Sequence, residues 1–445
     1  MFETDKRRMV QMTLSEFEKK NDTEDLLEKI LHEDNLKAAY NQVKKKGGAA
    51  GIDGMTVNDL LPYLNEHRDK LIQSIKAGYY KPKAVRTVEI PKPDGGTRKL
   101  GIPTVIDRMV QQAISQVLQP IFELTFSDSS YGFRPNRSPH QAVECMKEYY
   151  LQGYTHTVDI DLAKYFDTIN HDLLMEMVRK EIKDERINKL IRKFLKSGAM
   201  KDGLISETVE GTPQGGNLSP LLSNIYLTSF DRLLESRGLK FVRYADDCNI
   251  YVKSRRAAKR VMENCVKYLE GKLKLKVNTE KSKIGSPLKL KFLGFSLHKV
   301  CGKIGIRPHG KSIGKFKDEV RKITNRNRGR EIGLIFQELK SYTEGWLAYY
   351  RIADMKTKVE EMNRWIRQRL RLYLWKQWKT PKARRANLIR LGIPEWQAKE
   401  WAGTGKGYWR IAGSPILKTS LTNEHLASLG YRDISKMYEI MHPIH

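Results

Sequence analysis

Apolar residues recur every three or four positions along much of the chain, a spacing that predicts helices with one buried face. The stretches with this spacing lie within residues 1–75 and at residues 109–122, 172–196 and 254–274. Pro120 is expected to bend or end the second of these helices, because proline lacks the N–H that an interior helical residue donates. A loop with four glycines at residues 46–54 is expected to interrupt the N-terminal helices.

Alternating apolar and polar residues predict strands at residues 155–162 and 241–252, and a hairpin over residues 85–102. Strands that alternate with helices predict an α+β fold. After about residue 305 only the helical spacing remains, as at Ile335 and Leu339, so we expect a helical bundle in this part of the chain.

Residues 311–390, within this bundle, hold 22 Lys and Arg against 8 Asp and Glu. A run of charge is commonly no more than the solvated face of a helix. Here the charge is interleaved with the aromatic residues Trp365, Tyr373, Trp375 and Trp378. Because cations bind phosphates and aromatic rings stack on bases, this combination favours a nucleic-acid contact over a solvated surface.

The whole chain is strongly basic, since its 445 residues carry 81 Lys and Arg against 52 Asp and Glu, a formal net charge of +29. Such a charge favours a polyanionic partner, and nucleic acid is the default. No run of about 18 apolar residues is present, so we do not expect a membrane protein. The N-terminus lacks an apolar signal segment and the four cysteines form no Cys-x-x-Cys pair. We therefore expect a cytoplasmic protein with reduced thiols and no structural zinc.

Two acidic pairs lie at the ends of predicted strands. Asp159 and Asp161 share one face of their strand because side chains alternate, and Asp246 and Asp247 lie at the tip of a hairpin. Carboxylates that repel one another are stable together around Mg²⁺, which also keeps coordination positions for substrate phosphates. Two such ions favour phosphoryl transfer. Either pair by itself also fits a solvated strand edge or an ordinary turn.

The chain also carries an ordered series of longer motifs. They are Gly51–Gly54, Ile90–Pro103, Tyr131–Ser138, Asp161–Asp167, Gly211–Pro220, Tyr244–Asp247, Asn278–Lys281 and Phe292–Phe295. In these motifs and their order the chain resembles the reverse transcriptases encoded by group II introns, which act also as maturases. Within that family it is most similar to the short class without an endonuclease domain. The residues after Trp409 include three histidines but no cysteine with which to build a metal-binding nuclease.

The resemblance implies an α+β right-hand polymerase. Its fingers and palm would contain an antiparallel sheet, followed by an α-helical thumb and a small C-terminal DNA-binding region. The implied boundaries are a fingers extension at 1–75, fingers and palm at 76–305, the thumb or maturase domain X at 306–385, and the DNA-binding region at 386–445. The implied partners are group II intron RNA, an RNA template with a DNA primer, target DNA and a deoxynucleoside triphosphate (dNTP), with two Mg²⁺ ions as cofactors.

The resemblance also implies roles for single residues. The catalytic metal ligands would be Asp161, Asp246 and Asp247, with Asp159 in support. The residues implied to bind the substrate are Lys92, Arg98, Phe166, Gln214 and Lys281. Lys92 and Arg98 would hold the triphosphate, and Phe166 would exclude the 2′-hydroxyl of a ribonucleotide. Lys281 would position or protonate pyrophosphate, although a solvated surface lysine fits this position nearly as well.

The residues implied to contact nucleic acid are Gly51, Gly215, Gly216, Arg364, Arg367, Lys376, Lys379, Arg384 and Arg385. The glycines at 215 and 216 would admit the template–primer backbone, or would serve only a structural turn. Two alternatives compete with a group II polymerase: an RNA-binding maturase whose polymerase site is idle, and a retron- or defence-type reverse transcriptase. The three aspartates argue against the first, and the Gly-Ile-Asp-Gly motif with the long basic region argues against the second.

Overall fold

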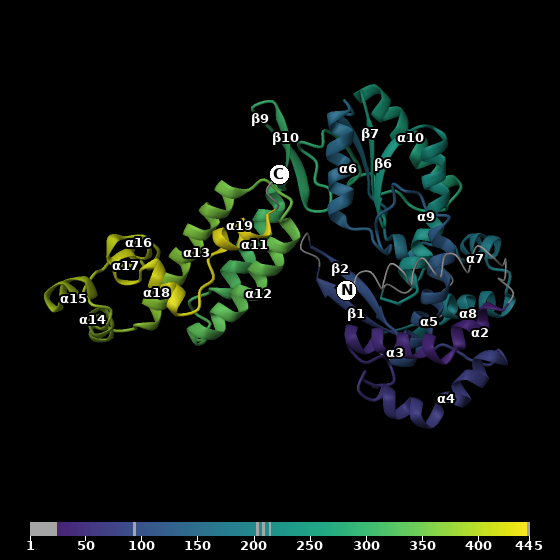
Figure 1. Cartoon of the computed structure of the whole chain (residues 1–445), viewed down its shortest axis with the longest axis horizontal. Coiled ribbons are helices and arrows are strands. Elements are labelled where there is room, and N and C mark those ends of the chain that lie inside the picture. The colour runs from purple at the N-terminus through teal and green to yellow at the C-terminus, as the bar shows by residue number, and fades with distance from the viewer. Residues whose placement is uncertain (1–24, 92–94, 202–203, 207–209, 213–214, 443–445) are drawn as a thin grey trace. The chain divides into compact units, whose positions relative to one another are not determined.

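The computed structural model describes residues 25–91, 95–201, 204–206, 210–212 and 215–442. The chain forms two compact units, one ending at Ser286 and one beginning at Pro287, and each is described by itself (Figure 1). No helix among the described residues is both long enough and apolar enough to cross a membrane.

The first unit combines helices with two four-stranded sheets. Its helices are α2 (Leu26–Leu31), α3 (Glu33–Lys46), α4 (Leu60–Lys76), α5 (Val105–Glu123), α6 (Pro139–Leu151), α7 (His171–Glu181), α8 (Glu185–Lys196), α9 (Ser219–Ser236) and α10 (Arg255–Gly271), with a 3₁₀ turn η1 (Tyr165–Asp167). Its strands are β1 (Val85–Pro91), β2 (Thr97–Ile102), β3 (His156–Ile160), β4 (Ala199–Lys201), β5 (Leu204–Ser206), β6 (Lys240–Tyr244), β7 (Asp247–Val252) and β8 (Lys283–Gly285).

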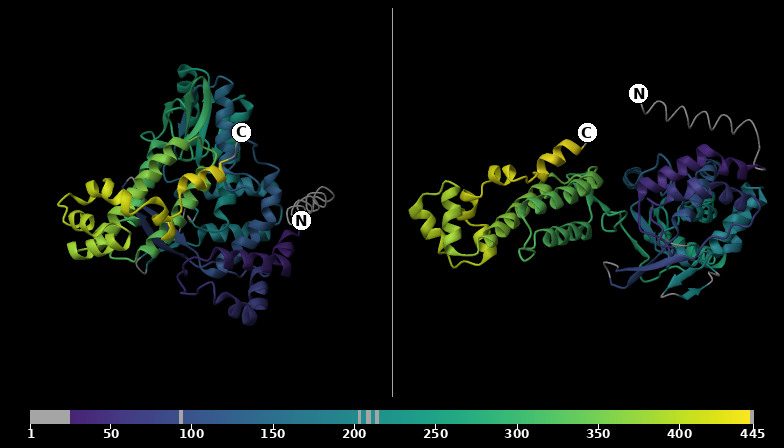
Figure 2. Two further views of the ribbon diagram at one scale, coloured as in Figure 1. Left: turned by 60° about the vertical axis from the view of Figure 1, so that its left-hand side comes forward. Right: turned by 90° about the horizontal axis from the view of Figure 1, so that it is seen from below.

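One sheet has the strand order β2-β1-β4-β5 and contains the predicted hairpin. β1 pairs antiparallel with β2 and parallel with β4. Helices α2 and α3 pack against α5, and Figure 2 shows these purple N-terminal helices beside the rest of the unit. The sequence pattern predicted the hairpin but not β4 and β5, which are three residues each and show too few positions for a period to be recognised.

The other sheet has the order β6-β7-β3-β8, with every neighbouring pair antiparallel. Helix α10 packs against β3 and β7, and α6 packs against β6. The buried residues Val158, Ile160, Phe241 and Ile250 contribute to the core beneath these helices. This arrangement confirms the predicted α+β class and the predicted strands at 155–162 and 241–252.

Two predicted helices differ in detail from the pattern. The single helix expected at 172–196 is divided into α7 and α8, because the Asp184 side chain caps α8 by accepting from the Arg186 N–H at 3.0 Å. The same carboxylate accepts the Leu27 N–H at 3.2 Å. Helix α5 does not end at Pro120 but continues to Glu123, and the buried ring of Phe122 anchors its last turn.

The second unit begins with a hairpin and continues with helices. The hairpin is β9 (Phe295–Val300) with β10 (Lys303–Pro308). The helices are α11 (Gly310–Ile323), α12 (Ile332–Tyr350), α13 (Lys356–Gln377), α14 (Pro381–Arg390), α15 (Glu395–Ala402), α16 (Tyr408–Ala412), α17 (Pro415–Ser420), α18 (Asn423–Ser428) and α19 (Ile434–Met441).

The C-terminal helices of this unit fold back onto its long helices. α16 and α19 pack against α13, and α19 also packs against α12. Both views in Figure 2 show these yellow helices next to the green ones. The division between compact units at residues 286 and 287 therefore differs from the predicted domain boundary at 305, because β9 and β10 belong with the helices that follow. The domain names assigned to these ranges stay predictions.

Candidate functional site

The predicted acidic hairpin forms one corner of the β6-β7-β3-β8 sheet. Tyr244 pairs with Asp247, so the turn between β6 and β7 consists of Ala245 and Asp246, with Ala245 in the left-handed region at φ 59°. Ile160, the last residue of β3, pairs with Cys248. Asp161 follows Ile160 directly, and Asp247 precedes Cys248 directly. The backbones of all three predicted aspartates therefore lie at one end of this sheet.

A buried amide links two of the carboxylates at this corner. The Asn249 Nδ2 lies 3.3 Å from Asp159 Oδ1 and 3.3 Å from Asp247 Oδ1. Asp159 and Asp247 are therefore linked through the Asn249 amide, and the supporting role of Asp159 stays a prediction. Among the described residues, no three His, Cys, Asp or Glu side chains converge closely enough to hold a metal ion. The donors are nevertheless of the kind that Mg²⁺ prefers, since all are carboxylate oxygens.

The loop that carries Lys281 fixes the backbone of Asp161. The Asp161 N–H donates to Ser282 Oγ at 3.1 Å, and the Asn278 N–H donates to the Asp161 carbonyl at 2.8 Å. Lys281 is exposed, and its own N–H donates to Asn278 Oδ1 at 3.2 Å. The structure therefore brings the Asn278–Lys281 motif next to Asp161, and the role of Lys281 stays a prediction.

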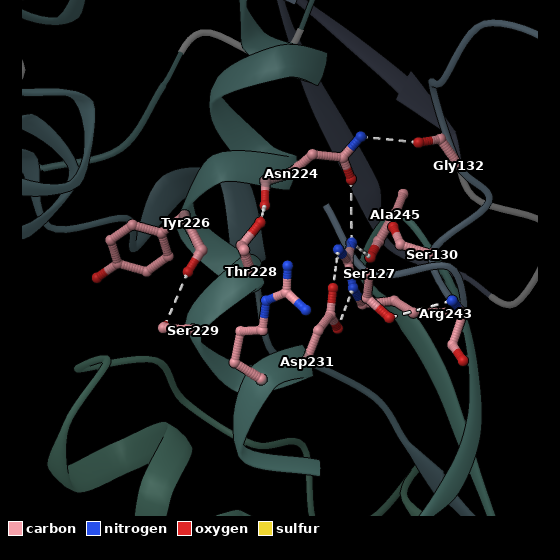
Figure 3. A network of polar contacts seen from close by, with 12 residues as sticks. Ser127, Ser130, Gly132, Asn224, Tyr226, Thr228, Ser229, Asp231, Arg243 and Ala245 are labelled. Atoms are coloured by element: carbon pink, nitrogen blue, oxygen red, sulfur yellow. Dashed lines mark hydrogen bonds and ion pairs between the residues drawn. The ribbon is translucent and has the colours of Figure 1, made fainter. Parts of the chain in front are cut away.

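A buried ion pair supports the turn of the acidic hairpin (Figure 3). The side chain of Arg243, in β6, is inaccessible to solvent and donates to both oxygens of Asp231, in α9, at 2.7 and 2.5 Å. Its Nη1 also donates to Asn224 Oδ1 at 3.0 Å and to the Ala245 carbonyl at 2.9 Å. Asn224 in turn donates to the Gly132 carbonyl at 2.8 Å. The guanidinium therefore holds the turn on which Asp246 lies.

The Tyr131–Ser138 motif packs against the same turn. The Tyr131 N–H donates to the Arg243 carbonyl at 2.8 Å. A Cβ at Gly132 would come within 2.3 Å of the Ala245 backbone nitrogen, so only glycine allows this approach. Sequence reasoning recognised the motif but missed Arg243, Asp231 and Asn224 as supports, because these contacts join segments that are distant in the sequence.

Burial and pairing act in opposite directions on this ion pair. Burial raises the pKa of the Asp231 carboxyl, and the Arg243 guanidinium counteracts that shift. Burial by itself would lower the pKa of the Arg243 guanidinium. The adjacent Asp231 carboxylate outweighs this effect and raises that pKa above its ordinary value. The pair is therefore stable as two charges only while both partners are present.

Phe166, the predicted steric gate, lies in η1 at a cavity of about 160 Å³. The cavity is also lined by Thr87 of β1, Lys99 of β2 and the loop residues Gly211 and Thr212. The Thr212 N–H donates to the Phe166 carbonyl at 2.7 Å, which fixes the turn. The structure thus brings Phe166 between the hairpin of the first sheet and the Gly211–Pro220 motif.

Three residues that are predicted to bind the substrate lie wholly or partly outside the described structure. Lys92 and Gln214 lie outside the described residues. The backbone of Arg98 pairs with Ile90 in the β1-β2 hairpin, but its side chain lies outside the described part of the structure.

The predicted glycine contacts have a structural explanation within the unit. A Cβ at Gly51 would lie 2.6 Å from the Thr104 Cα, and a Cβ at Gly215 would lie 2.6 Å from the Gly101 carbonyl oxygen. A Cβ at Gly216 would come within 2.7 Å of a glutamine side chain on α5. Packing against backbone therefore requires glycine at positions 51 and 215, whether or not nucleic acid passes over them.

Two family models match parts of the chain. The family model "Reverse transcriptase (RNA-dependent DNA polymerase)" matches residues 90–297, and "Group II intron, maturase-specific domain" matches residues 313–392. Protein YkfC of Escherichia coli (strain K12) is 37% identical over 286 residues, which cover 56% of this chain and 75% of YkfC. The chain belongs to the reverse transcriptases of group II introns.

Other relatives are matched over a smaller share of their length. The group II intron-encoded protein LtrA of Lactococcus lactis subsp. cremoris is 37% identical over 254 residues, which cover 56% of this chain but 42% of LtrA. Among solved structures, a chain of a partial Cas6-RT-Cas1–Cas2 complex matches 55% of this chain and 42% of its own length at 23% identity, with a TM-score of 0.36.

Within the maturase-specific region of this group II intron protein, α13 carries two predicted RNA contacts. Arg364 and Arg367 line a cavity of about 870 Å³, together with Arg371 and with Lys418 of α17. Arg364 is exposed, whereas Arg367 lies 3.8 Å from the Asp433 carboxylate. The structure therefore groups these cations on one side of the helix, where a phosphate could reach them.

The other four predicted nucleic-acid contacts of this unit differ in their surroundings. They are Lys376, Lys379, Arg384 and Arg385. Lys379 is exposed and Lys376 lies 5.1 Å from the centroid of the Tyr408 ring. Arg384 covers the Trp375 ring at 4.6 Å, and Arg385 forms an ion pair with a glutamate of α15. The two arginines and Lys376 thus have structural partners, while the exposed Lys379 is better placed for an external ligand.

The expected base-stacking surface needs correction. The side chains of Tyr373 and Trp375 are almost entirely buried, at 1% exposure each. They fill the core between helices, because α13 presents more than one face to its neighbours. Of the four aromatic residues predicted to stack on bases, only Trp365 and Trp378 retain partly accessible rings.

Proposed function

We propose that this protein is an RNA-directed DNA polymerase that copies group II intron RNA into cDNA, and that it also acts as a maturase for that intron. The proposal is supported by the position of Asp161, Asp246 and Asp247 at one end of the β6-β7-β3-β8 sheet, in a chain that belongs to the group II intron reverse transcriptases. We propose the cytoplasm as its location.

Asp161, Asp246 and Asp247 are the residues that would hold Mg²⁺, and we propose two ions. When bound, the ions would supply charge stabilisation for the attacking and leaving oxygens of nucleotide transfer. The protein's own task at this corner is orientation. The Asn249 amide holds the Asp247 carboxylate, and the Arg243 guanidinium holds the turn that presents Asp246.

The remaining substrate residues have separate tasks. Phe166 excludes ribonucleotides by steric overlap with the 2′-hydroxyl. Lys92 and Arg98 bind the triphosphate, for which the bidentate fork of arginine is well suited. Lys281 donates hydrogen bonds or a proton to pyrophosphate, and Gln214 contacts the incoming nucleotide beside the glycines that follow it.

Maturase action would rest on binding, because the splicing chemistry belongs to the RNA. Intron RNA would contact the cations of α13, chiefly Arg364 and Arg367, and target DNA would contact the C-terminal helices. Phosphate contacts of this kind require basic surface and no carboxylates. The polymerase and maturase activities are therefore expected to fail independently.

The test is primer extension on an RNA template with Mg²⁺, using the Asp246→Asn and Asp247→Asn variants. Each change keeps the side-chain shape but removes the charge that attracts the cation, so synthesis should fall by at least about a thousandfold, or roughly 4 kcal/mol of barrier. Asp69→Asn, which removes an exposed carboxylate from α4, is the matched control and should extend primers like wild type. Wild-type synthesis by Asp246→Asn would refute the assignment of the site.

The same protein preparations should be assayed for excision of the cognate intron at low Mg²⁺. We expect the double aspartate variant to support splicing at close to the wild-type rate. Arg364→Glu with Arg367→Glu should impair splicing. Loss of splicing in the aspartate variant, with an unchanged melting temperature, would contradict the separation of the two activities. Normal splicing without any cDNA synthesis by wild type would favour the alternative of a maturase with an idle polymerase site.

A further inference from the structure

A basic cavity lies in the first unit, away from the acidic hairpin. Its volume is about 750 Å³, and it is formed by the end of α4, the connection at residues 77–82 and one side of α8. Seven of its lining residues are Lys or Arg, and none is Asp or Glu. No role for this cavity follows from the polymerase site or from the cations of α13.

Some of these cations already have partners inside the protein. Arg186 forms a 2.7 Å ion pair with Glu28, and Arg192 forms one of 2.7 Å with Asp172. The four exposed lysines of the cavity are Lys76, Lys81, Lys189 and Lys196. Within the part of the chain that the structure describes, these four side chains make no hydrogen bond or ion pair. The cavity therefore holds a concentration of charge that the described protein does not neutralise.

Hydrogen bonds to other parts of the first unit fix the connection at residues 77–82. Lys193 Nζ donates to the carbonyls of Gly78 and Tyr80, at 2.5 and 3.1 Å. The Tyr80 hydroxyl donates to the buried Asp107 carboxylate at 2.7 Å. Between these two anchored residues, the side chain of Tyr79 is 78% exposed. An aromatic ring on a fixed backbone is thus presented to solvent beside the cavity.

We propose that this cavity and Tyr79 together bind single-stranded RNA. A positively charged groove that follows the phosphates, combined with an aromatic platform for an unpaired base, is the usual construction of a single-strand site. The lysines bind the phosphates and Tyr79 stacks on a base. The choice of RNA over DNA rests on the proposed function, in which RNA is both the template and the splicing partner.

The test measures binding of a labelled, unstructured RNA of about 12 nucleotides, within the ~4–16-nucleotide span of single-strand sites. Fluorescence anisotropy is followed at several salt concentrations. Lys81→Ala with Lys189→Ala should weaken binding about tenfold. This pair should also reduce the slope of log K against log salt by about 1.4, which is roughly 0.7 for each lost phosphate contact on a single strand.

Matched controls separate this site from general attraction to a basic protein. Lys70→Ala with Lys180→Ala removes the same charge from exposed positions on α4 and α7 that do not line the cavity. This control should bind RNA within about twofold of wild type. Tyr79→Leu should weaken binding about tenfold, because leucine offers no flat ring, whereas Tyr79→Phe should bind like wild type.

The outcomes distinguish this inference from the proposed function. Equal weakening by the cavity pair and the control pair would refute the cavity as a site, even if wild type copies RNA normally. Single-stranded DNA of the same sequence, bound as tightly and with the same sensitivity to the variants, would overturn the assignment to RNA. The Asp246→Asn variant should bind the RNA like wild type. Loss of cDNA synthesis there, with binding retained, supports both proposals, whereas retained synthesis would refute the polymerase site alone.

Discussion

Replacing Asp231 by alanine should strongly destabilise the first unit. The substitution leaves the guanidinium of Arg243 in a position inaccessible to solvent, and it removes hydrogen bonds of 2.7 and 2.5 Å. Breaking a buried pair in this way costs about 3–5 kcal/mol. The loss of two charge-assisted hydrogen bonds, each worth about 1.5–3 kcal/mol, predicts a similar cost in stability. The loss is a large fraction of the ~5–15 kcal/mol that stabilises a typical domain.

The assay must report on the correct unit. All seven tryptophans lie between Trp346 and Trp409, so tryptophan fluorescence follows only the second unit. Hydrogen exchange of peptides from α9, β6 and β7 follows the first unit, and a loss of 3 kcal/mol should speed their slowest exchange by roughly 150-fold. Asp128→Ala is the control, because it removes an exposed Arg–Asp pair of 2.7 Å with Arg137, which is worth about 0–1 kcal/mol.

Replacing Arg243, the other partner of the pair, should lower the stability of the first unit by an amount that depends on pH. In Arg243→Met the Asp231 carboxyl loses the cation that opposes its raised pKa, so its pKa in the folded state rises further above the unfolded value. A carboxyl with a raised folded pKa lowers stability as the pH rises through that range, so the deficit of Arg243→Met should shrink as the pH falls from 7 toward 5. The deficit of Asp231→Ala should persist, since a guanidinium cannot lose its proton. Exchange in Asp231→Ala within about threefold of wild type would refute this reasoning.

Three further outcomes are expected. Phe166→Ala should raise the ratio of ribonucleotide to deoxyribonucleotide incorporation about tenfold, and an unchanged ratio in single-nucleotide extension would mean that the gate lies elsewhere. Asn249→Leu should lower the rate of primer extension about tenfold, because the Asp247 carboxylate loses its 3.3 Å contact. It should also raise the Mg²⁺ concentration needed for half-maximal rate, and a Mg²⁺ titration unaltered from wild type would contradict this. Lys376→Ala with Lys379→Ala should reduce the salt slope of intron RNA binding by about 1.4, whereas Arg385→Ala, whose side chain is paired internally, should leave it close to wild type in the same titrations.

Much of the fold and part of the site could be predicted because the signals are local. The hairpin at 85–102, the strands at 155–162 and 241–252 and most helices follow from spacing within a few residues. The same alternation predicted that Asp159 and Asp161 share a face. Spacing alone failed at the division between α7 and α8, because the N-cap formed by Asp184 interrupts a helical pattern that the apolar positions continue.

The aromatic residues of α13 show the limit of such patterns. Trp375 and Tyr373 stand among cations in the sequence, and that mixture suggested an exposed stacking surface. Helical periodicity fixes which residues share a face, but it does not say how many faces neighbouring helices cover. The packing of α16 and α19 against α13 decided that these two rings are buried.

By itself, the sequence determined the α+β class and the order of the motifs, and it predicted the class of partner and the three aspartates, because charge, periodicity and motif order are properties of the linear chain. The tertiary structure alone decided what supports and surrounds them. Gly132, Asn224 and Arg243 form one hydrogen-bonded network although Gly132 and Asn224 are 92 residues apart. Lys76 and Lys189 likewise line one cavity from two different helices. Neither arrangement leaves a local pattern, since each exists only when folding brings distant segments within a few ångströms.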